Sequence, residues 1–548
     1  MTRSMKPKTH YGLNEALLHP DHSKPKSRRD FLAQGFKLGG ATMLGVSINS
    51  LLSSRAHALS SNLLTDPDSY TPTGTCDLNP AAGGRKIPFI CFDLAGGANI
   101  SGSNVLVGGP GGQLDLLSAG GYQKLGLPAD LNPNPSSAAD TFIDDSLGLL
   151  FHSESAMLSG IKEKCSAATM AATNGAVIPS RSDNDTGNNP HNPMYGIYDA
   201  QARGGLVQLI GSEVSASGGN SMAPNSYMAL YPDIRPTKIS SPSDAAGLVD
   251  VGSLNSLFAD SADTLAVMES MKRITDYKLG ISDTLMTNDE ALKQRLSCEY
   301  LRSADTYEKF DSPDKIDPSK DPLIVGASGI FGVDEFNGDR EFRKAASVMK
   351  LVIDGHAAAG TIEMGGYDYH TGDRNTGEGR DLRAGRCIGA CIEYAMRRRT
   401  PLMLYVFSDG SVASDGSIER MAGLGQGKCV WSGDNSSTGS AFFLVIDPDG
   451  GRPSLLDMGP NGADDPLTHQ QIGWMRDDAS VETSATPAAN NVNMLVETVI
   501  LNYMALHGEE GSFAADRGLG SETNNRRYRA FTQLASVSGG IINPPPIT

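Results

Sequence analysis

The most regular alternation of apolar and polar positions in this chain lies in its second half. Apolar side chains recur at helical spacing over residues 342–353. The run "GTIEM" (360–364) then predicts a strand, residues 381–399 a second helix, and "PLMLYVFSD" (401–409) a second strand. Helices that alternate with strands in this way predict parallel neighbours in a doubly wound, mostly parallel α/β sheet.

Three further patterns predict elements of the same domain. The run "IPFICFDLAGGAN" (87–99) predicts a buried strand that ends in a glycine turn, and "AFFLVIDPDGGRPSLL" (441–456) predicts a hairpin. Residues 494–507 predict a last helix. These patterns indicate one α/β domain over 86–510, followed by an irregular tail over 511–548.

A separate helical pattern between about residues 261 and 310 predicts an insertion into this domain. Leu265, Met268 and Met271 recur at helical spacing, and "TNDE" (287–290) has the form of a capping box ahead of a second apolar stripe. Such a methionine stripe is more typical of a packed helix face than of a ligand site. We therefore expect a helical hairpin.

The N-terminal 58 residues have the three parts of a twin-arginine export signal in the expected order. Arg28 and Arg29 precede a weakly apolar, glycine-rich stretch, which is followed by an A-x-A site, "AHA", at 56–58. Residues 59–85 are rich in Pro and Gly and predict a linker. We expect the export machinery as a partner and the periplasm or cell exterior as the destination.

The excess of acidic over basic residues argues against nucleic acid and anionic membranes as partners. The full sequence carries a formal net charge of −17, and removal of residues 1–58, with nine basic and three acidic side chains, leaves −23. Such a charge repels phosphate backbones and anionic membranes. We expect a protein that does not bind nucleic acid and has no integral membrane segment in the mature chain.

The segment "MGGYDYHTGD" (364–373) carries the strongest candidate chemistry. In an extended segment, side chains two apart point the same way, so Asp368 and His370 converge on one point. Asp409 closes the next predicted strand and reaches the same edge of the sheet. A divalent metal held there would activate a water molecule for ester hydrolysis. The alternative is a hydrogen-bonded pair that only closes a strand.

A second group of donors lies in the loop "RSDNDTGNNPHNPMYG" (181–196). Its aspartates, its asparagines and His191 suit a hard cation such as Ca²⁺, although a solvated turn explains the same residues. A centre with two Zn²⁺ ions would have to draw on His191, His370 and His469, because the other histidines of the mature chain are few. Zinc and calcium both remain open as cofactors.

Several short motifs of this chain resemble a known family. The twin-arginine signal, "LAGGAN", "SRS", "YGIYDAQ", "GGYDYHT", "FSDGS" and the late hairpin look like the exported bacterial proteins of domain of unknown function 1501. That family is itself similar to the alkaline phosphatase and sulfatase superfamily of metal-dependent hydrolases. The resemblance spans roughly 86–507 and implies an alkaline-phosphatase-like core.

The resemblance also implies a set of metal ligands: Asp368, His370 and Asp409, assisted by Asn99. The family has Gly-Gly-x-Asp where this chain has Asn99, and it has Asp-Thr-His where Tyr369 replaces the threonine. A later Asp-His pair of the family has no full counterpart in "WSGDNSSTGS" (431–440).

Two functions follow from these residues. The first is a metal-dependent hydrolase of phosphate or sulfate esters. The second is a catalytically degenerate binding or assembly protein of the periplasm, which the altered acid at Asn99 favours. The residues do not name a substrate or a nucleophile.

Overall fold

The computed structural model describes the chain from residue 85 onward, in segments. These are 85–137, 140–181, 191–215, 218–219, 234–250, 261–281, 289–290, 293–294, 296–297, 310, 312–370, 372, 374–456, 470–513, 519 and 526–542. The predicted signal, all of the predicted linker except residue 85, and the predicted capping box up to residue 288 lie outside them. The chain divides into two compact units, of which the larger comprises Asn79–Asp250 and Ser312–Thr548.

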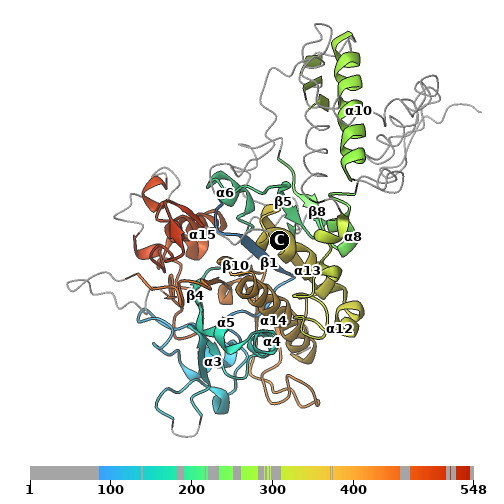
Figure 1. The fold of residues 1–548 in the computed structure, drawn as a ribbon. Helices are drawn as coiled ribbons and strands as arrows, with labels where there is room; N and C mark the ends of the chain where they lie inside the picture. The colour runs from blue at the N-terminus through green and yellow to red at the C-terminus, as the bar shows by residue number, and fades with distance from the viewer. Residues whose placement is uncertain are drawn as a thin grey trace, which may run out of the picture. The chain divides into compact units, whose positions relative to one another are not determined.

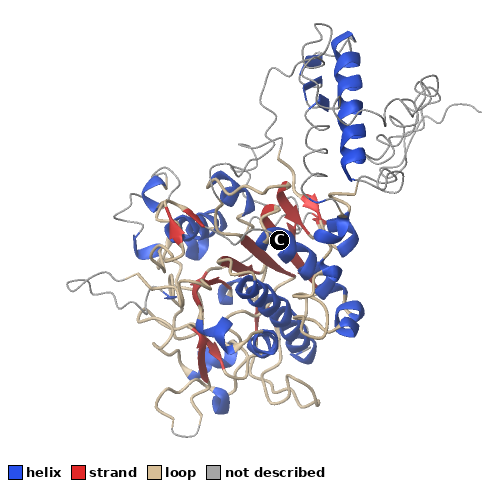
Figure 2. Ribbon diagram, in the orientation of Figure 1, coloured by secondary structure: helices blue, strands red, loops and turns tan. Residues whose placement is uncertain are grey.

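The larger unit is built around a seven-stranded, mostly parallel sheet (Figures 1 and 2). Its strands in spatial order are β4 (Thr173–Pro179), β13 (Ser440–Ile446), β10 (Leu402–Phe407), β1 (Phe89–Ala95), β9 (Ala357–Gly365), β5 (Val207–Gly211) and β8 (Thr237–Lys238). Strands β10, β1, β9, β5 and β8 pair in parallel, whereas β13 is antiparallel to both β10 and β4. The predicted α/β class with a mostly parallel sheet is therefore confirmed.

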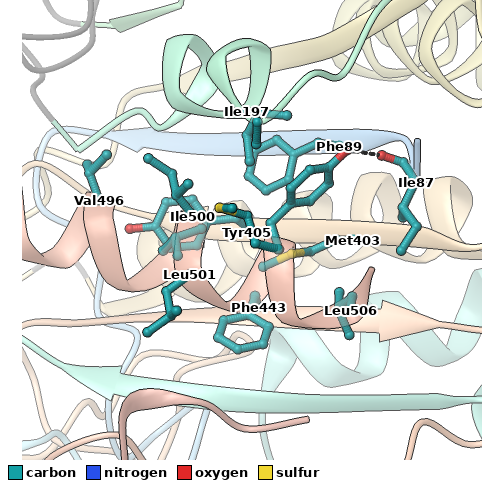
Figure 3. Close-up of a cluster of buried hydrophobic side chains, with 14 of the residues drawn as sticks. Ile87, Phe89, Ile197, Met403, Tyr405, Phe443, Val496, Ile500, Leu501 and Leu506 are labelled. Atoms are coloured by element: carbon teal, nitrogen blue, oxygen red, sulfur yellow. Dashed lines mark hydrogen bonds between the residues drawn. The ribbon is translucent and has the colours of Figure 1, made fainter. Parts of the chain in front are cut away.

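Strand β1 lies at the centre of the sheet, and its apolar side chains are buried on both faces. Phe89 and Cys91 point into a core shared with helices α6 (Met194–Asp199) and α15 (Val492–Leu506), as Figure 3 shows for Phe89. Ile90 and Phe92, which alternate with them, are fully buried as well. A strand buried on both faces reads as a continuous apolar run, and this is the pattern of the predicted strand.

Helices cover both faces of this sheet. Helix α13 (Arg340–Ile353) lies against β9, where Gly360 leaves room for it: a Cβ at this glycine would lie 2.6 Å from Cγ1 of Val348. Helix α14 (Arg374–Arg397) packs beside α13 and against α4 (Ala156–Lys164). Together with α6 and α15 on the other face, this arrangement is compatible with a doubly wound fold.

Two elements differ from the sequence predictions. Helix α14 begins at Arg374, seven residues before the predicted start, because Arg374 and Glu378 are buried partners in its first turns rather than loop residues. The predicted hairpin over 441–456 does not form. Its first half is β13, which pairs with β10 and β4, whereas the bridge of Leu455 is to Phe531.

The remaining elements are short, apart from one helix of the smaller unit. That helix is α10 (Ser261–Ile281), within the segment predicted to be an insertion. The shorter helices are α3 (Ala119–Lys124), α5 (Ala167–Ala171), α8 (Pro242–Ala246) and α12 (Val333–Gly338). Four two-stranded sheets complete the larger unit: β2 (Ile143–Leu147) with β3 (Leu149–His152), β6 (Val214–Ser215) with β7 (Gly218–Gly219), β11 (Val412–Ala413) with β12 (Gly433–Asp434), and β14 (Val537–Ser538) with β15 (Ile541–Ile542). No described helix has both the length and the apolar character needed to cross a membrane.

Candidate metal centre

The carboxyl ends of β1, β9 and β10 meet at one edge of the sheet, as the parallel pairing requires. The turn after β1 is held there by the end of β10: the N–H of Gly96 donates to Oδ1 of Asp409 (2.7 Å), and the N–H of Ala98 donates to Oγ of Ser408 (2.8 Å). Gly96 has a φ of +121°, and a Cβ at this position would lie 2.6 Å from the backbone nitrogen of Asp368. Only glycine permits this close approach of the β1 turn to the segment after β9.

That segment keeps the alternation of an extended chain. Tyr367 and Tyr369 point inward and are 1% and 3% exposed, whereas Asp368 and His370 lie on the solvent side. The predicted convergence of Asp368 and His370 is confirmed: Nδ1 of His370 lies 3.2 Å from Oδ1 of Asp368. Because Tyr369 lies between them and points inward, Asp368 and His370 face solvent on the same side.

A third donor, Asp434, reaches this pair from a different part of the chain. Asp434 pairs with Val412 in the two-stranded sheet of β11 and β12, which follows β10 in the chain. Oδ1 of Asp434 lies 2.5 Å from Nδ1 of His370. This hydrogen bond, together with the charges of Asp434 and Asp368, raises the pKa of His370 above its usual value.

The three side chains fit a divalent metal. One ligand atom from each of Asp368, His370 and Asp434 can be chosen so that all lie within 4.8 Å of one another. Carboxylate oxygen and imidazole nitrogen together suit Zn²⁺ and similar ions, and three protein ligands leave a position for water or substrate. Asp368 and Asp434 keep 70% and 61% of their side-chain surface exposed, so a ligand could approach from solvent.

The other predicted ligands lie outside this group of three. Asp409 is 4% exposed and accepts the Gly96 N–H, so it holds the glycine turn. Asn99 is 3% exposed, and its side-chain Nδ2 donates to Oγ of Ser103 (2.6 Å). His191 is buried and stacks on Phe407 at a centroid distance of 5.6 Å, and burial lowers its pKa to about 4.

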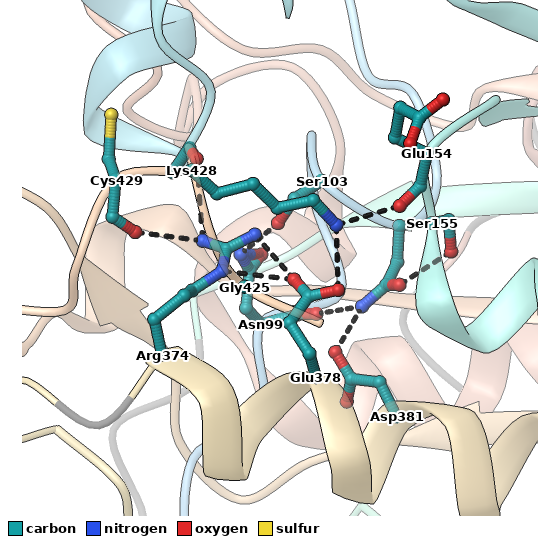
Figure 4. Close-up of polar contacts among 12 residues, drawn as sticks. Asn99, Ser103, Glu154, Ser155, Arg374, Glu378, Asp381, Gly425, Lys428 and Cys429 are labelled. Carbon is teal, nitrogen blue, oxygen red and sulfur yellow. Dashed lines mark hydrogen bonds and ion pairs between the residues drawn. The ribbon is translucent and has the colours of Figure 1, made fainter. Parts of the chain in front are cut away.

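Behind the exposed group lies a buried polar network, drawn in Figure 4. The guanidinium of Arg374, which is fully buried, donates to Oε1 of Glu378 through Nη2 (2.6 Å), and Lys428 Nζ donates to Oε2 of the same carboxylate (2.7 Å). Glu378 thus lies between two cations. The ring of Trp431 lies below the guanidinium of Arg374, 4.4 Å from its carbon to the ring centroid.

The network continues to Asp381, which is 4% exposed. Its Oδ2 accepts a hydrogen bond from Nδ2 of Asn104 (2.8 Å), whereas its buried Oδ1 has no hydrogen-bond partner among the described residues. Burial, followed by the charge of nearby Glu378, raises the pKa of Asp381 to about 7.

Sequence reasoning missed Asp434 and the buried role of Arg374. Asp434 is the only acidic residue in the polar segment "WSGDNSSTGS" (431–440), so it was a usable signal. Arg374 stands in a polar, glycine-containing stretch with no apolar periodicity, and nothing in that pattern indicates burial.

Comparisons with known proteins add no relative. No family model matches the chain, and neither a curated protein nor a solved structure matches it.

Proposed function

We propose that this chain is an exported, metal-dependent hydrolase of phosphate or sulfate esters with an alkaline-phosphatase-like core. The observation that carries the proposal is the grouping of Asp368, His370 and Asp434 within 4.8 Å at the carboxyl edge of a mostly parallel sheet. Ligands of such sheets bind at this edge, where loops bring side chains from several strands together.

Each residue of the group has a separate task in this proposal. Asp368 and Asp434 supply negative charge from two different segments, and His370 supplies a nitrogen ligand once it has lost its proton. A divalent metal held by them would lower the pKa of a bound water molecule and polarise an ester oxygen. The hydrogen bond from Gly96 to Asp409 closes the turn after β1.

A binding protein without turnover is the second candidate, and one observation favours it. At the position where the resembled family has an acid, Asn99 has a neutral side chain whose Nδ2 is occupied by Ser103 and by the carbonyl of Leu125 (3.3 Å). Asn99 therefore adds no charge for a second metal ion. A single cation at the exposed group would then serve recognition of a glycan or a protein.

Two measurements separate these candidates. Thermal unfolding and calorimetric titration with Zn²⁺, Mn²⁺ and Ca²⁺ test metal binding, and hydrolysis of aryl phosphate and aryl sulfate esters by the metal-loaded protein tests turnover. We expect Asp434→Asn to lower metal affinity at least about tenfold, since it removes a ligand charge. Asp415→Asn is the matched control, because Asp415 is an exposed aspartate of the segment between β11 and β12 that accepts the N–H of Ser417.

The possible outcomes are distinct. Metal binding with ester hydrolysis, both weakened by Asp434→Asn but not by Asp415→Asn, supports the hydrolase. Metal binding without turnover of either ester supports the binding protein. Failure of the parent protein to bind any of the three ions would refute both.

A further inference from the structure

Tyr369 lies between two of the candidate ligands and points in the opposite direction. Its neighbours Asp368 and His370 face solvent, while its own ring is 3% exposed and lies 6.4 Å from the ring of Trp431. Gly377 of helix α14 borders the ring on another side: a Cβ at this glycine would lie 3.1 Å from it. The ring is therefore enclosed, and it fixes the backbone that both ligands share.

The hydroxyl of Tyr369 connects this backbone to the loop after β1. It accepts a hydrogen bond from the N–H of Asn99 (2.9 Å). On the other side of that residue, the carbonyl of Asn99 accepts a hydrogen bond from Nδ2 of Asn104 (2.7 Å). Asn104 is held in turn by Asp381 (2.8 Å) and by Oγ of Ser155 (2.6 Å).

This chain of hydrogen bonds fixes the position of the backbone that carries Asp368 and His370. Asn104 is 2% exposed and uses both of its amide hydrogens and its carbonyl oxygen, so it has one orientation that satisfies every bond. The backbone of Asn99 is fixed from both sides, and the phenol of Tyr369 transmits that position to Asp368 and His370. Side chains that orient metal ligands typically change metal affinity by 10–100-fold when they are lost.

We propose that Tyr369 is a positioning residue for the candidate metal centre, acting through its hydrogen bond to the Asn99 backbone. This inference rests on the proposed function in so far as that function requires a metal at Asp368, His370 and Asp434. The phenol itself lies in the interior, on the opposite side of the backbone from the candidate ligands. It holds the two ligands on either side of it at the separation that lets Asp434 complete the group.

The same segment offers a matched control. Tyr367 is also a buried tyrosine, two residues earlier, and its hydroxyl also makes one hydrogen bond to the backbone, donating to the carbonyl of Arg380 (3.0 Å). That bond ties the segment to helix α14 instead of the β1 loop. Tyr367→Phe and Tyr369→Phe therefore remove the same group from the same strand end, and both keep the aromatic ring that fills the space.

The test compares these two variants with the parent by calorimetric titration of Zn²⁺ and Mn²⁺ at pH 8, and by thermal unfolding without metal. We expect Tyr369→Phe to weaken metal binding at least about tenfold. Tyr367→Phe should change metal affinity less than about twofold. This difference should hold even if both variants lose the same amount of thermal stability. The difference in affinity at matched stability is the result that a purely structural role would not produce.

Equal metal affinities in the two variants would overturn the positioning role and leave the metal centre standing. A parent protein that binds neither ion would overturn the proposed function and this inference together. Thermal unfolding of the metal-free variants confirms that each is folded in the titration.

Discussion

At the scale of single residues, Asp409 at the end of β10 was predicted to be a metal ligand, but in the structure it stabilises a turn. Asp409 stands at the carboxyl edge, as predicted, but it is 4% exposed and accepts the Gly96 N–H at 2.7 Å. A charged acceptor for a backbone N–H makes a stronger hydrogen bond than a neutral one. Gly96 directly follows the last residue of β1, and Asp409 supplies the partner of its N–H there.

Replacement of Asp409 by alanine should therefore affect stability more than metal binding. We expect the free energy of unfolding without metal to fall by about 1–3 kcal/mol, the cost of leaving the partly buried N–H of Gly96 unpaired. The stabilisation that added Zn²⁺ gives should stay close to that of the parent, measured as the shift in unfolding temperature. A variant with parental stability but no metal-induced shift would instead make Asp409 a ligand.

At the scale of elements, the sequence predicted those parts of the fold and the site that depend on local patterns. The apolar runs indicated β1, β9 and β10, and the two-residue alternation correctly gave Asp368 and His370 a common direction. Long-range pairing was not predictable in this way. The strands β11 and β12 have two residues each, too few for any periodicity, yet they bring Asp434 to His370.

Helix α14 carries a buried carboxyl group, Asp381, that makes the stability of the fold depend on pH. Asp381 has a pKa of about 7 in the folded protein, against a usual value of 3.8. The groups that face it are Glu378 and Arg374 on its own helix, Lys428 beyond them, the phenols of Tyr367 and Tyr369, and the amide of Asn104. Between these two pKa values, the folded state holds a proton that the unfolded state has released.

Stability linked to Asp381 is therefore present at pH 4 and is lost as the pH rises toward 7, by roughly 1.4 kcal/mol per pH unit. Asp381→Asn should remove this component, because the amide is neutral at every pH and its oxygen can still accept from Asn104. Urea unfolding of parent and variant at pH 5 and pH 7.5 measures the difference. Parallel pH profiles for the two proteins would show that Asp381 is ionised throughout.

At the scale of the whole molecule, the sequence predicts export through a twin-arginine signal in residues 1–58. This segment lies outside the described residues. Twin-arginine signals are read by a receptor, and the paired arginines are the part that is recognised. Changing Arg28 and Arg29 together to lysine should leave the precursor in the cytoplasm with its fold intact. Cell fractionation and immunoblotting follow the distribution, and normal accumulation of the double variant in the periplasm would contradict this route.

The division into two units leads to a prediction about folding. Residues Val251–Asp311 belong, with Met1–Leu78, to a different compact unit from the sheet. The core of the sheet is formed by strands and helices outside this segment. A unit that keeps most of its contacts to itself can be removed without exposing the core of another. We therefore expect a variant in which a Gly/Ser linker replaces 251–311 to retain the far-UV circular dichroism of the α/β unit.

The same variant should also unfold cooperatively in urea, because the apolar residues of β1, β10 and β13 and of helix α15 remain buried against one another. Metal binding at Asp368, His370 and Asp434 provides an independent control, since all three ligands belong to the retained unit. An unchanged metal affinity with a sharp unfolding transition is the expected result. A broad transition with loss of metal binding would show that residues 251–311 contribute to the core of the sheet.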